Sequence, residues 1–239
     1  MVESFRKQLE AFRAVGYHFV NLEEALGFLG AGDLDKPIMT VTFDDGYRSI
    51  YENAVPVLND LGIKAFLYVT ADYIHKGFAY RNETTSPVMS WQQLRELVEQ
   101  GYGIGSHTLT HAPLRLCNSA RLMQECALSK RILEDNLQIP IRHLSYPWGQ
   151  HSRRTRVFLS SNGLYQSAAT IDRGSMYPKH DPYKLRRDLC DPMISVKSML
   201  RLMRMADYFY WLRYLRKKPE GYWKRHPEEK WSALEDFEE

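Results

Sequence analysis

The sequence contains little cysteine and shows no disulfide framework. Its 239 residues include three cysteines, Cys117, Cys126 and Cys190. The number is odd, and the spacing matches neither a zinc knuckle nor the paired pattern of a small secreted domain. We therefore expect reduced, buried thiols and exclude the class of disulfide-stabilised small domains.

A long apolar run is also missing. No segment approaches the roughly 20 apolar residues with which a helix crosses a bilayer. The first residues lack the basic stretch and apolar stretch of a secretory signal. These absences predict a cytoplasmic protein, or an extracytoplasmic one if the natural start lies upstream.

Neither charge sign is in large excess. Lys and Arg number 32 against 29 Asp and Glu, a net charge of +3, which is too small to indicate nucleic-acid binding. Residues 195–218 nevertheless hold seven basic residues and one Asp, and residues 219–239 hold seven acidic and three basic residues. We expect a basic, aromatic helix over 194–218, which could cover the preceding domain or contact a membrane surface, and then an acidic tail over 219–239.

Residues 1–193 show no repeat, and their apolar pattern alternates between two periods. An apolar, β-branched run predicts a strand at 38–43, and the alternation continues with strands at 65–69, 103–105, 143–146 and 166–170. Helical spacing predicts helices at 5–15, 22–29, 50–61, 91–99, 119–137 and 155–161. Alternating strands and helices form parallel βα units, so the sequence predicts one α/β catalytic domain over 1–193.

Two carboxylates stand where the strand at 38–43 ends. Asp44 and Asp45 lead into Gly46, at the position where parallel α/β folds place ligand and catalytic groups. Asp-Asp-Gly is equally suited to an ordinary solvated turn. Both interpretations stay open on this motif alone.

Two histidines follow the strand at 103–105. His107 and His111 are four positions apart, so on a helical turn they would lie on one face and could hold one metal ion. With one aspartate they would form a three-ligand set that leaves a position open for water or substrate. Because Asp44 and Asp45 are adjacent, one would bind the metal and the other would act as a base.

A third polar turn, Tyr146-Pro147-Trp148-Gly149, follows the strand at 143–146. Its Pro and Gly fix the backbone, whose N–H groups could face a developing negative charge. The Trp148 ring could provide an apolar surface for a sugar. A purely structural turn would explain the same residues.

The order and spacing of these three motifs resemble those of the polysaccharide deacetylases, carbohydrate esterase family 4, which carry the NodB-homology domain. The resemblance covers about residues 5–191 and is closest in motif style to deacetylases of poly-N-acetylglucosamine and other exopolysaccharides. It implies an irregular, incomplete (β/α) barrel with a C-terminal helical extension. It also implies a hydrolase that removes N-acetyl groups from N-acetylhexosamine units of a glycan, with a divalent metal that is usually Zn²⁺, or Co²⁺ or Ni²⁺.

The resemblance implies a role for each motif residue. Asp44 would be the general base, and the main-chain N–H of Trp148 would be the oxyanion donor. The metal ligands would be Asp45, His107 and His111. The substrate contacts would come from Tyr146, Pro147 and Trp148.

Three features depart from the family pattern. Many members have an arginine at the position of Ser145, where it steadies the catalytic aspartate, and Arg186 or Arg187 could replace it. The late Leu-x-His motif that supplies a general acid is missing, which leaves as candidates His143, His151 and His180. Relatives often have a further strand before the first helix, so either the barrel is shorter or the chain begins late.

Two other functions stay open. A glycan-binding protein could keep the pocket without turnover, although a binding site needs no base at Asp44. A hydrolase of O-acetyl esters or non-sugar amides could use the same residues.

Overall fold

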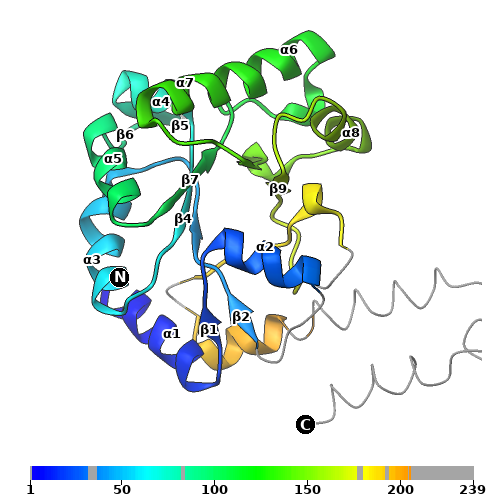
Figure 1. Ribbon diagram of the computed structural model, residues 1–239. Coiled ribbons are helices and arrows are strands. Elements are labelled where there is room, and N and C mark those ends of the chain that lie inside the picture. The colour runs from blue at the N-terminus through cyan, green and yellow to red at the C-terminus, as the bar shows by residue number, and fades with distance from the viewer. Residues whose placement is uncertain are drawn as a thin grey trace, which may run out of the picture.

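A five-stranded parallel sheet is the centre of the computed structural model, which describes residues 2–31, 37–81, 84–176, 180–191, 194–203 and 205. The strand order is β3 (Thr42–Phe43), β4 (Phe66–Val69), β7 (Gly103–Ser106), β8 (His143–Ser145) and β9 (Ser167–Ala169). Every pair in this sheet is parallel. The sheet curls into a half-barrel with helices around it, as the sequence predicts (Figure 1).

The helices follow the strands along the chain. They are α1 (Val2–Ala14), α2 (Leu22–Ala31), α3 (Val55–Asp60), α4 (Ala71–Lys76), α5 (Trp91–Glu99), α6 (Ser119–Met123), α7 (Ser129–Leu137) and α8 (Arg153–Ser161). π-Helical turns precede α3 at Ile50–Ala54 and join α6 to α7 at Gln124–Leu128. Short 3₁₀ turns occupy Leu114–Leu116, Pro147–Gly149 and Pro182–Lys184. Among the described residues, no helix is long and apolar enough to span a membrane.

The predicted strand at 38–43 is wrong in one respect, because it is two strands. β2 (Ile38–Met39) pairs in parallel with β1 (His18–Phe19), while β3 pairs with β4. The chain changes partner in between: the carbonyl of Met39 accepts from Val20 N (3.0 Å), and that of Val41 accepts from Phe66 N (2.9 Å). A continuous apolar run gives no sign of such a change.

Some short helices and strands were not predicted from the sequence. β1 has two residues, and α4 has six. The antiparallel pair β5 (Phe78–Arg81) and β6 (Thr84–Pro87) was missed as well. All are too short for a period of 2.0 or 3.6 to be recognised.

The predicted C-terminal helix lies largely outside the described residues. Residues 196–203 and 205 are helical, and the preceding segment is fixed to α1, because Gln8 Nε2 donates to the carbonyls of Asp191 (2.7 Å) and Ile194 (3.0 Å). The remainder of the helix and the acidic tail at 219–239 are outside the part described. Of the three thiols, Cys117 and Cys126 are buried as expected, while Cys190 is exposed.

The two faces of the central sheet pack against different residues. Side chains on the outer face, such as Leu67 and Ile104, belong to the larger apolar core beneath the helices. Phe66 and Tyr68 belong to a second, smaller cluster on the inner face. Two glycines of β7, Gly103 and Gly105, are in register with these two aromatic residues of β4. Their missing side chains make room for the aromatic rings: a Cβ on Gly105 would lie 2.7 Å from Phe66 Cε1 and 2.8 Å from Tyr68 Cδ1.

We predict that Gly105→Ala lowers the free energy of unfolding by about 1–3 kcal/mol, since the added methyl overpacks the barrel interior. The matched control is Gly27→Ala in α2, where a Cβ would meet nothing within 4 Å and alanine favours the helix. Urea denaturation of both variants measures the difference. Equal midpoints for the two would contradict the proposed packing.

Candidate active site

The predicted motifs meet at one edge of the sheet. Asp44 and Asp45 directly follow β3, His107 directly follows β7, and Ser145 is the last residue of β8. In a parallel sheet the carboxyl ends of all strands lie at the same edge. Residues up to 101 positions apart in the sequence are thereby brought into contact, as in the hydrogen bond from Ser145 Oγ to Asp44 Oδ2 (3.3 Å).

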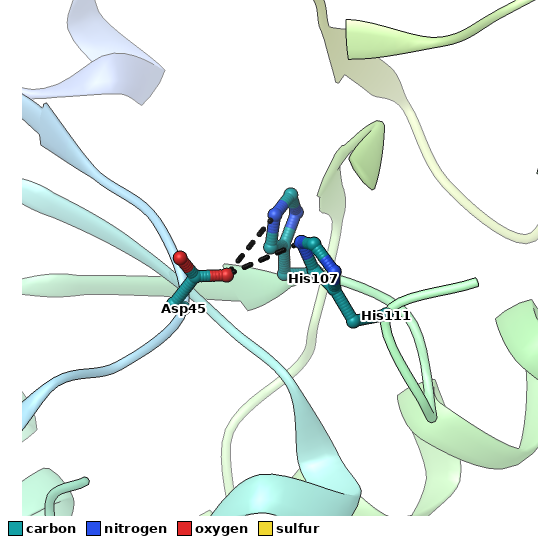
Figure 2. A group of neighbouring side chains, drawn as sticks. All are labelled: Asp45, His107 and His111. Atoms are coloured by element: carbon teal, nitrogen blue, oxygen red, sulfur yellow. Dashed lines mark ion pairs between the residues drawn. The ribbon is translucent and has the colours of Figure 1, made fainter. Parts of the chain in front are cut away.

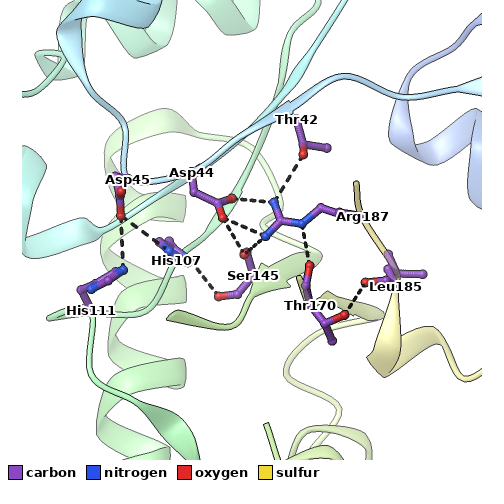
Figure 3. A network of polar contacts seen from close by, with 9 residues as sticks. All are labelled: Thr42, Asp44, Asp45, His107, His111, Ser145, Thr170, Leu185 and Arg187. Atoms are coloured by element: carbon purple, nitrogen blue, oxygen red, sulfur yellow. Dashed lines mark hydrogen bonds and ion pairs between the residues drawn. The ribbon is translucent and has the colours of Figure 1, made fainter. Parts of the chain in front are cut away.

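A left-handed turn separates the two adjacent aspartates. Asp45 has φ +70° and Gly46 has φ +84°, and Gly46 N donates to the carbonyl of Asp44 (2.9 Å). The turn directs the Asp45 carboxylate toward the two histidines and the Asp44 carboxylate toward Arg187 (Figure 3). Glycine is required at position 46, because a Cβ there would lie 3.1 Å from Val69 Cγ1 at an unfavourable φ.

Asp45, His107 and His111 form a compact cluster (Figure 2). Asp45 Oδ1 lies 3.6 Å from His107 Nε2 and 3.3 Å from His111 Nε2, and one ligand atom from each residue lies within 4.8 Å of the others. Two imidazoles and one carboxylate are a donor set that suits a divalent ion with an open coordination position. The residues present therefore fit the metal that the sequence predicts.

A backbone contact fixes the tautomer of His107. Its Nδ1 lies 2.9 Å from the carbonyl oxygen of Ser145, and a carbonyl can only accept, so Nδ1 carries the proton. In the neutral ring the lone pair is then on Nε2, the nitrogen that faces Asp45. An imidazole held in this way through its second nitrogen is a ready metal ligand.

His111 reaches the cluster by a different route from the one predicted. We expected the two histidines on a helical turn, but residues 107–113 are irregular, with left-handed φ at Thr108 (+69°) and His111 (+61°). The His111 ring contacts two aromatic rings: it stacks on Tyr73 at 6.0 Å and meets Trp148 edge to face at 4.9 Å. The spacing of four residues correctly indicated that the two imidazoles lie together, and the helix was wrong.

Arg187 makes a two-point ion pair with Asp44. Its two terminal nitrogens lie 2.7 and 2.8 Å from the two carboxylate oxygens, and one of them also donates to Ser145 Oγ (2.9 Å). Burial alone would raise the pKa of Asp44, but His107, Arg187 and Ser145 together hold this pKa below its ordinary value. The carboxylate is thus kept ionised and ready to accept a proton.

Arg187 is itself held in place from several sides. Nε donates to the carbonyl of Thr170 (2.8 Å), a terminal nitrogen donates to Thr42 Oγ1 (3.3 Å), and the guanidinium lies 5.6 Å from the centre of the Tyr68 ring. Arg186 instead donates to the carbonyl of Ser175 (3.4 Å). Of the two arginines suggested by the sequence, Arg187 is therefore the one that supports Asp44.

The side chains of the Tyr-Pro-Trp-Gly turn differ in their exposure to solvent. Tyr146 is fully buried and donates its hydroxyl to the carbonyl of Tyr183 (3.0 Å), and Pro147 is also buried. Trp148 is 44% exposed, at a left-handed φ of +59°. Of the three residues expected to contact substrate, Trp148 alone offers an exposed side chain, and the other two support the turn. The role of the Trp148 N–H as oxyanion donor stays a prediction.

The three candidate acids lie in different surroundings. His143 is buried two residues before the end of β8, and its two ring nitrogens contact Ser167 Oγ (2.8 Å) and Glu23 Oε1 (3.0 Å). These contacts connect α2 to the inside of the barrel. Burial lowers the pKa of His143, so its protonated form, which a general acid needs, is less populated near neutral pH. His151 stacks on Tyr146 at 5.3 Å. His180 precedes Asp181, which pairs with Arg156 of α8.

Comparison with known proteins gives one family. The polysaccharide deacetylase profile matches residues 31–167, which is more than half of the chain. YxkH of Bacillus subtilis, whose name places it among the polysaccharide deacetylases, is 29% identical over 65% of this chain and 52% of its own length. The poly-β-1,6-N-acetyl-D-glucosamine N-deacetylase of Staphylococcus epidermidis is 26% identical over 78% of this chain and 66% of its own length. The chain thus spans between about half and two thirds of these relatives.

Solved structures share the fold. The Streptococcus pyogenes deacetylase PplD, determined in complex with acetate, superimposes with a TM-score of 0.75 at 24% identity and covers 84% of this chain and 86% of its own. IcaB from Ammonifex degensii superimposes with a TM-score of 0.72 at 25% identity, over 86% of this chain and 88% of its own. Both likenesses confirm the incomplete barrel.

We predict that His111→Ala weakens Zn²⁺ binding by at least about 100-fold, because one of three protein ligands is lost. Competition with a chromophoric chelator measures the affinity directly. His151→Ala, which changes a histidine outside the ligand cluster, is the control and should leave the affinity unchanged. Equal Zn²⁺ affinity in the His111 variant and the native protein would contradict the ligand assignment.

We predict that Arg187→Met lowers the free energy of unfolding by about 2 kcal/mol, because it leaves the Asp44 charge without its partner. A double-mutant cycle with Asp44→Asn should give a coupling of at least about 1 kcal/mol. Since folding lowers the pKa of Asp44, this coupling is fully present above the ordinary pKa of 3.8 and is lost as the pH falls through the lower pKa of the folded state.

The exposed pair Arg6 and Asp60 (2.6 Å) provides the control cycle. Its coupling should stay below about 1 kcal/mol, since solvent screens it. Equal coupling in the two cycles would show that the Asp44 pair is an ordinary surface contact.

Proposed function

The chain belongs to the polysaccharide deacetylase family, and on this basis we propose that it is a metal-dependent hydrolase that removes N-acetyl groups from N-acetylhexosamine units of a polysaccharide or glycan precursor. One observation carries the proposal. An ionised carboxylate, Asp44, stands next to a cluster of two histidines and one aspartate that fits a divalent ion. A base beside a Lewis-acid site is the arrangement that amide hydrolysis requires.

For the metal we propose Zn²⁺. Two imidazoles and one carboxylate are borderline ligands that suit Zn²⁺, and Co²⁺ and Ni²⁺ accept similar donors. When bound, such an ion would polarise the acetamide carbonyl and make water more acidic. Asp45, His107 and His111 would hold it.

Asp44 would accept the proton of the attacking water. Its two oxygens are fixed by Arg187, which limits the directions from which a proton can approach. The same ion pair keeps the pKa of the carboxyl low, so that the basic form is present at neutral pH. Arg187 therefore acts as the positioning residue of the base.

Trp148 would line the substrate side of the site. Its exposed ring packs against the edge of His111, next to the ligand cluster, and an indole face suits the apolar face of a sugar or an acetyl methyl. The left-handed backbone at Trp148 would aim its N–H at the oxyanion.

As substrate we propose a β-1,6-linked N-acetylglucosamine polymer. The support is the name of the Staphylococcus epidermidis relative, which aligns with 78% of this chain. The small residue Ser145 in place of the usual motif arginine, with Arg187 in its stead on Asp44, is consistent with that branch of the family.

We predict that the chelated protein releases acetate from β-1,6-linked N-acetylglucosamine oligomers only after Zn²⁺ or Co²⁺ is added. Asp44→Asn should lower kcat by at least about 100-fold, since it removes the general base, while metal affinity is retained. The exposed Asp60→Asn serves as control. Acetate is quantified by an enzyme-coupled assay.

Several outcomes would contradict the proposal. No acetate from any N-acetylated glycan, with metal bound, would favour a glycan-binding protein. Release from O-acetyl esters alone would change the substrate class. Full turnover in Asp44→Asn would remove the assignment of the base.

A further inference from the structure

Glu125 is a fully buried acidic residue that the mechanism above does not use. It lies in the π-helical turn Gln124–Leu128. Its carboxylate accepts from Leu109 N (3.0 Å), Thr110 N (2.9 Å) and Thr110 Oγ1 (2.6 Å). All three donors belong to the segment between the metal ligands His107 and His111.

The helix that carries Glu125 is shaped for this contact. The backbone carbonyl of Glu125 also accepts from Leu109 N (3.0 Å), and Arg121, one turn earlier, pairs with the carboxylate at 2.6 Å. The wide π-helical turn presents both oxygen groups of one residue to the same loop. Such turns are frequently found at functional sites.

The opposite side of the loop is fixed by α4. Ala71 N donates to the carbonyl of Thr108 (3.2 Å), and Asp72 N donates to the carbonyl of Leu109 (2.9 Å). The amides of the loop are thus held by Glu125 and its carbonyls by the first turn of a helix.

The shape needs this support because it is strained. Thr108 and His111 both have left-handed φ, which costs about 1–2 kcal/mol for each residue with a side chain. If the Glu125 side chain could not accept, Thr110 N would lose its partner, and Leu109 N would keep only the backbone carbonyl of Glu125. The loop would then relax toward ordinary φ values, and His111 would leave the cluster.

We propose that Glu125 is a positioning residue of the metal site, which holds the 108–110 segment so that His111 Nε2 meets Asp45 and His107. The inference rests on the metal binding proposed above. Its specific content is that the accepting oxygen of Glu125, and not only its charge, sets the affinity for the ion.

Two substitutions at position 125 separate the effect of the accepting oxygen from the effect of the charge. Glu125→Gln keeps an amide oxygen that can accept from both backbone N–H groups, and Glu125→Leu keeps the volume without any acceptor. We expect Glu125→Leu to weaken Zn²⁺ binding about 10–100-fold, the usual effect of losing a partner behind the ligands, and Glu125→Gln to stay within about threefold of the native protein.

Glu134→Leu is the matched control. Glu134 on α7 likewise accepts from a backbone amide, Ile141 N (2.9 Å), and pairs with Lys130 (2.7 Å), but it has no contact with the ligand loop among the bonds described. We expect Glu134→Leu to lower the stability of the metal-free protein, as Glu125→Leu does, but to leave the Zn²⁺ affinity unchanged.

The measurements are Zn²⁺ affinity by chelator competition and unfolding of the metal-free protein by urea. Equal Zn²⁺ affinity in Glu125→Leu and the native protein overturns the inference, as does a Gln variant as weak as the Leu variant. If the native protein itself binds no Zn²⁺, the proposed metal site fails instead. Should Glu125→Leu not fold, Thr110→Val removes the hydrogen bonds of Thr110 Oγ1 with Glu125 and Arg121. This variant should weaken Zn²⁺ binding about threefold, and no change there overturns the inference.

Discussion

The division of work between two adjacent carboxylates depends on the left-handed backbone at Asp45 and Gly46. In an extended or helical segment, neighbouring side chains would be fixed relative to one another by the regular period. Here the chain turns sharply, so that Asp45 reaches the histidines while Asp44 reaches Arg187 (Figure 3). The two proposed roles depend on this separation, because the proposed ligand cluster and the proposed base each need a carboxylate of their own.

Unfavourable backbone is concentrated around this turn. Five residues other than glycine have positive φ in the described parts of the chain, and four of them are at the site: Asp45, Thr108, His111 and Trp148. Such conformations persist only where the surroundings fix them. The surroundings do so by hydrogen bonds between the loop and Glu125 and α4, and by the two aromatic rings that contact His111.

The sequence predicted the site better than the path of the chain through it. Aspartates and histidines at the ends of apolar strands were sufficient to predict that Asp45, His107 and His111 lie together, because parallel strands bring their carboxyl ends together. The helical turn between the histidines was wrong, since spacing alone does not separate a helix from a strained loop. Glu125 was missed, because a buried acid in a helix has no distinctive pattern. The sequence could name Arg187 only as an alternative to Arg186. Which of the two arginines reaches Asp44 depends on contacts with Tyr68 and Thr170.

The position of Arg187 late in the sequence affects the order in which the domain is completed during synthesis. The ion pair joins residues 143 positions apart, and Gln8 bonds across 183 and 186 positions to the segment just beyond it. During synthesis Asp45, His107 and His111 would leave the ribosome well before either contact could form. A partly made chain could therefore bring these three side chains together early, whereas Asp44 would receive its counter-ion only when the last part of the barrel docks on the first helix.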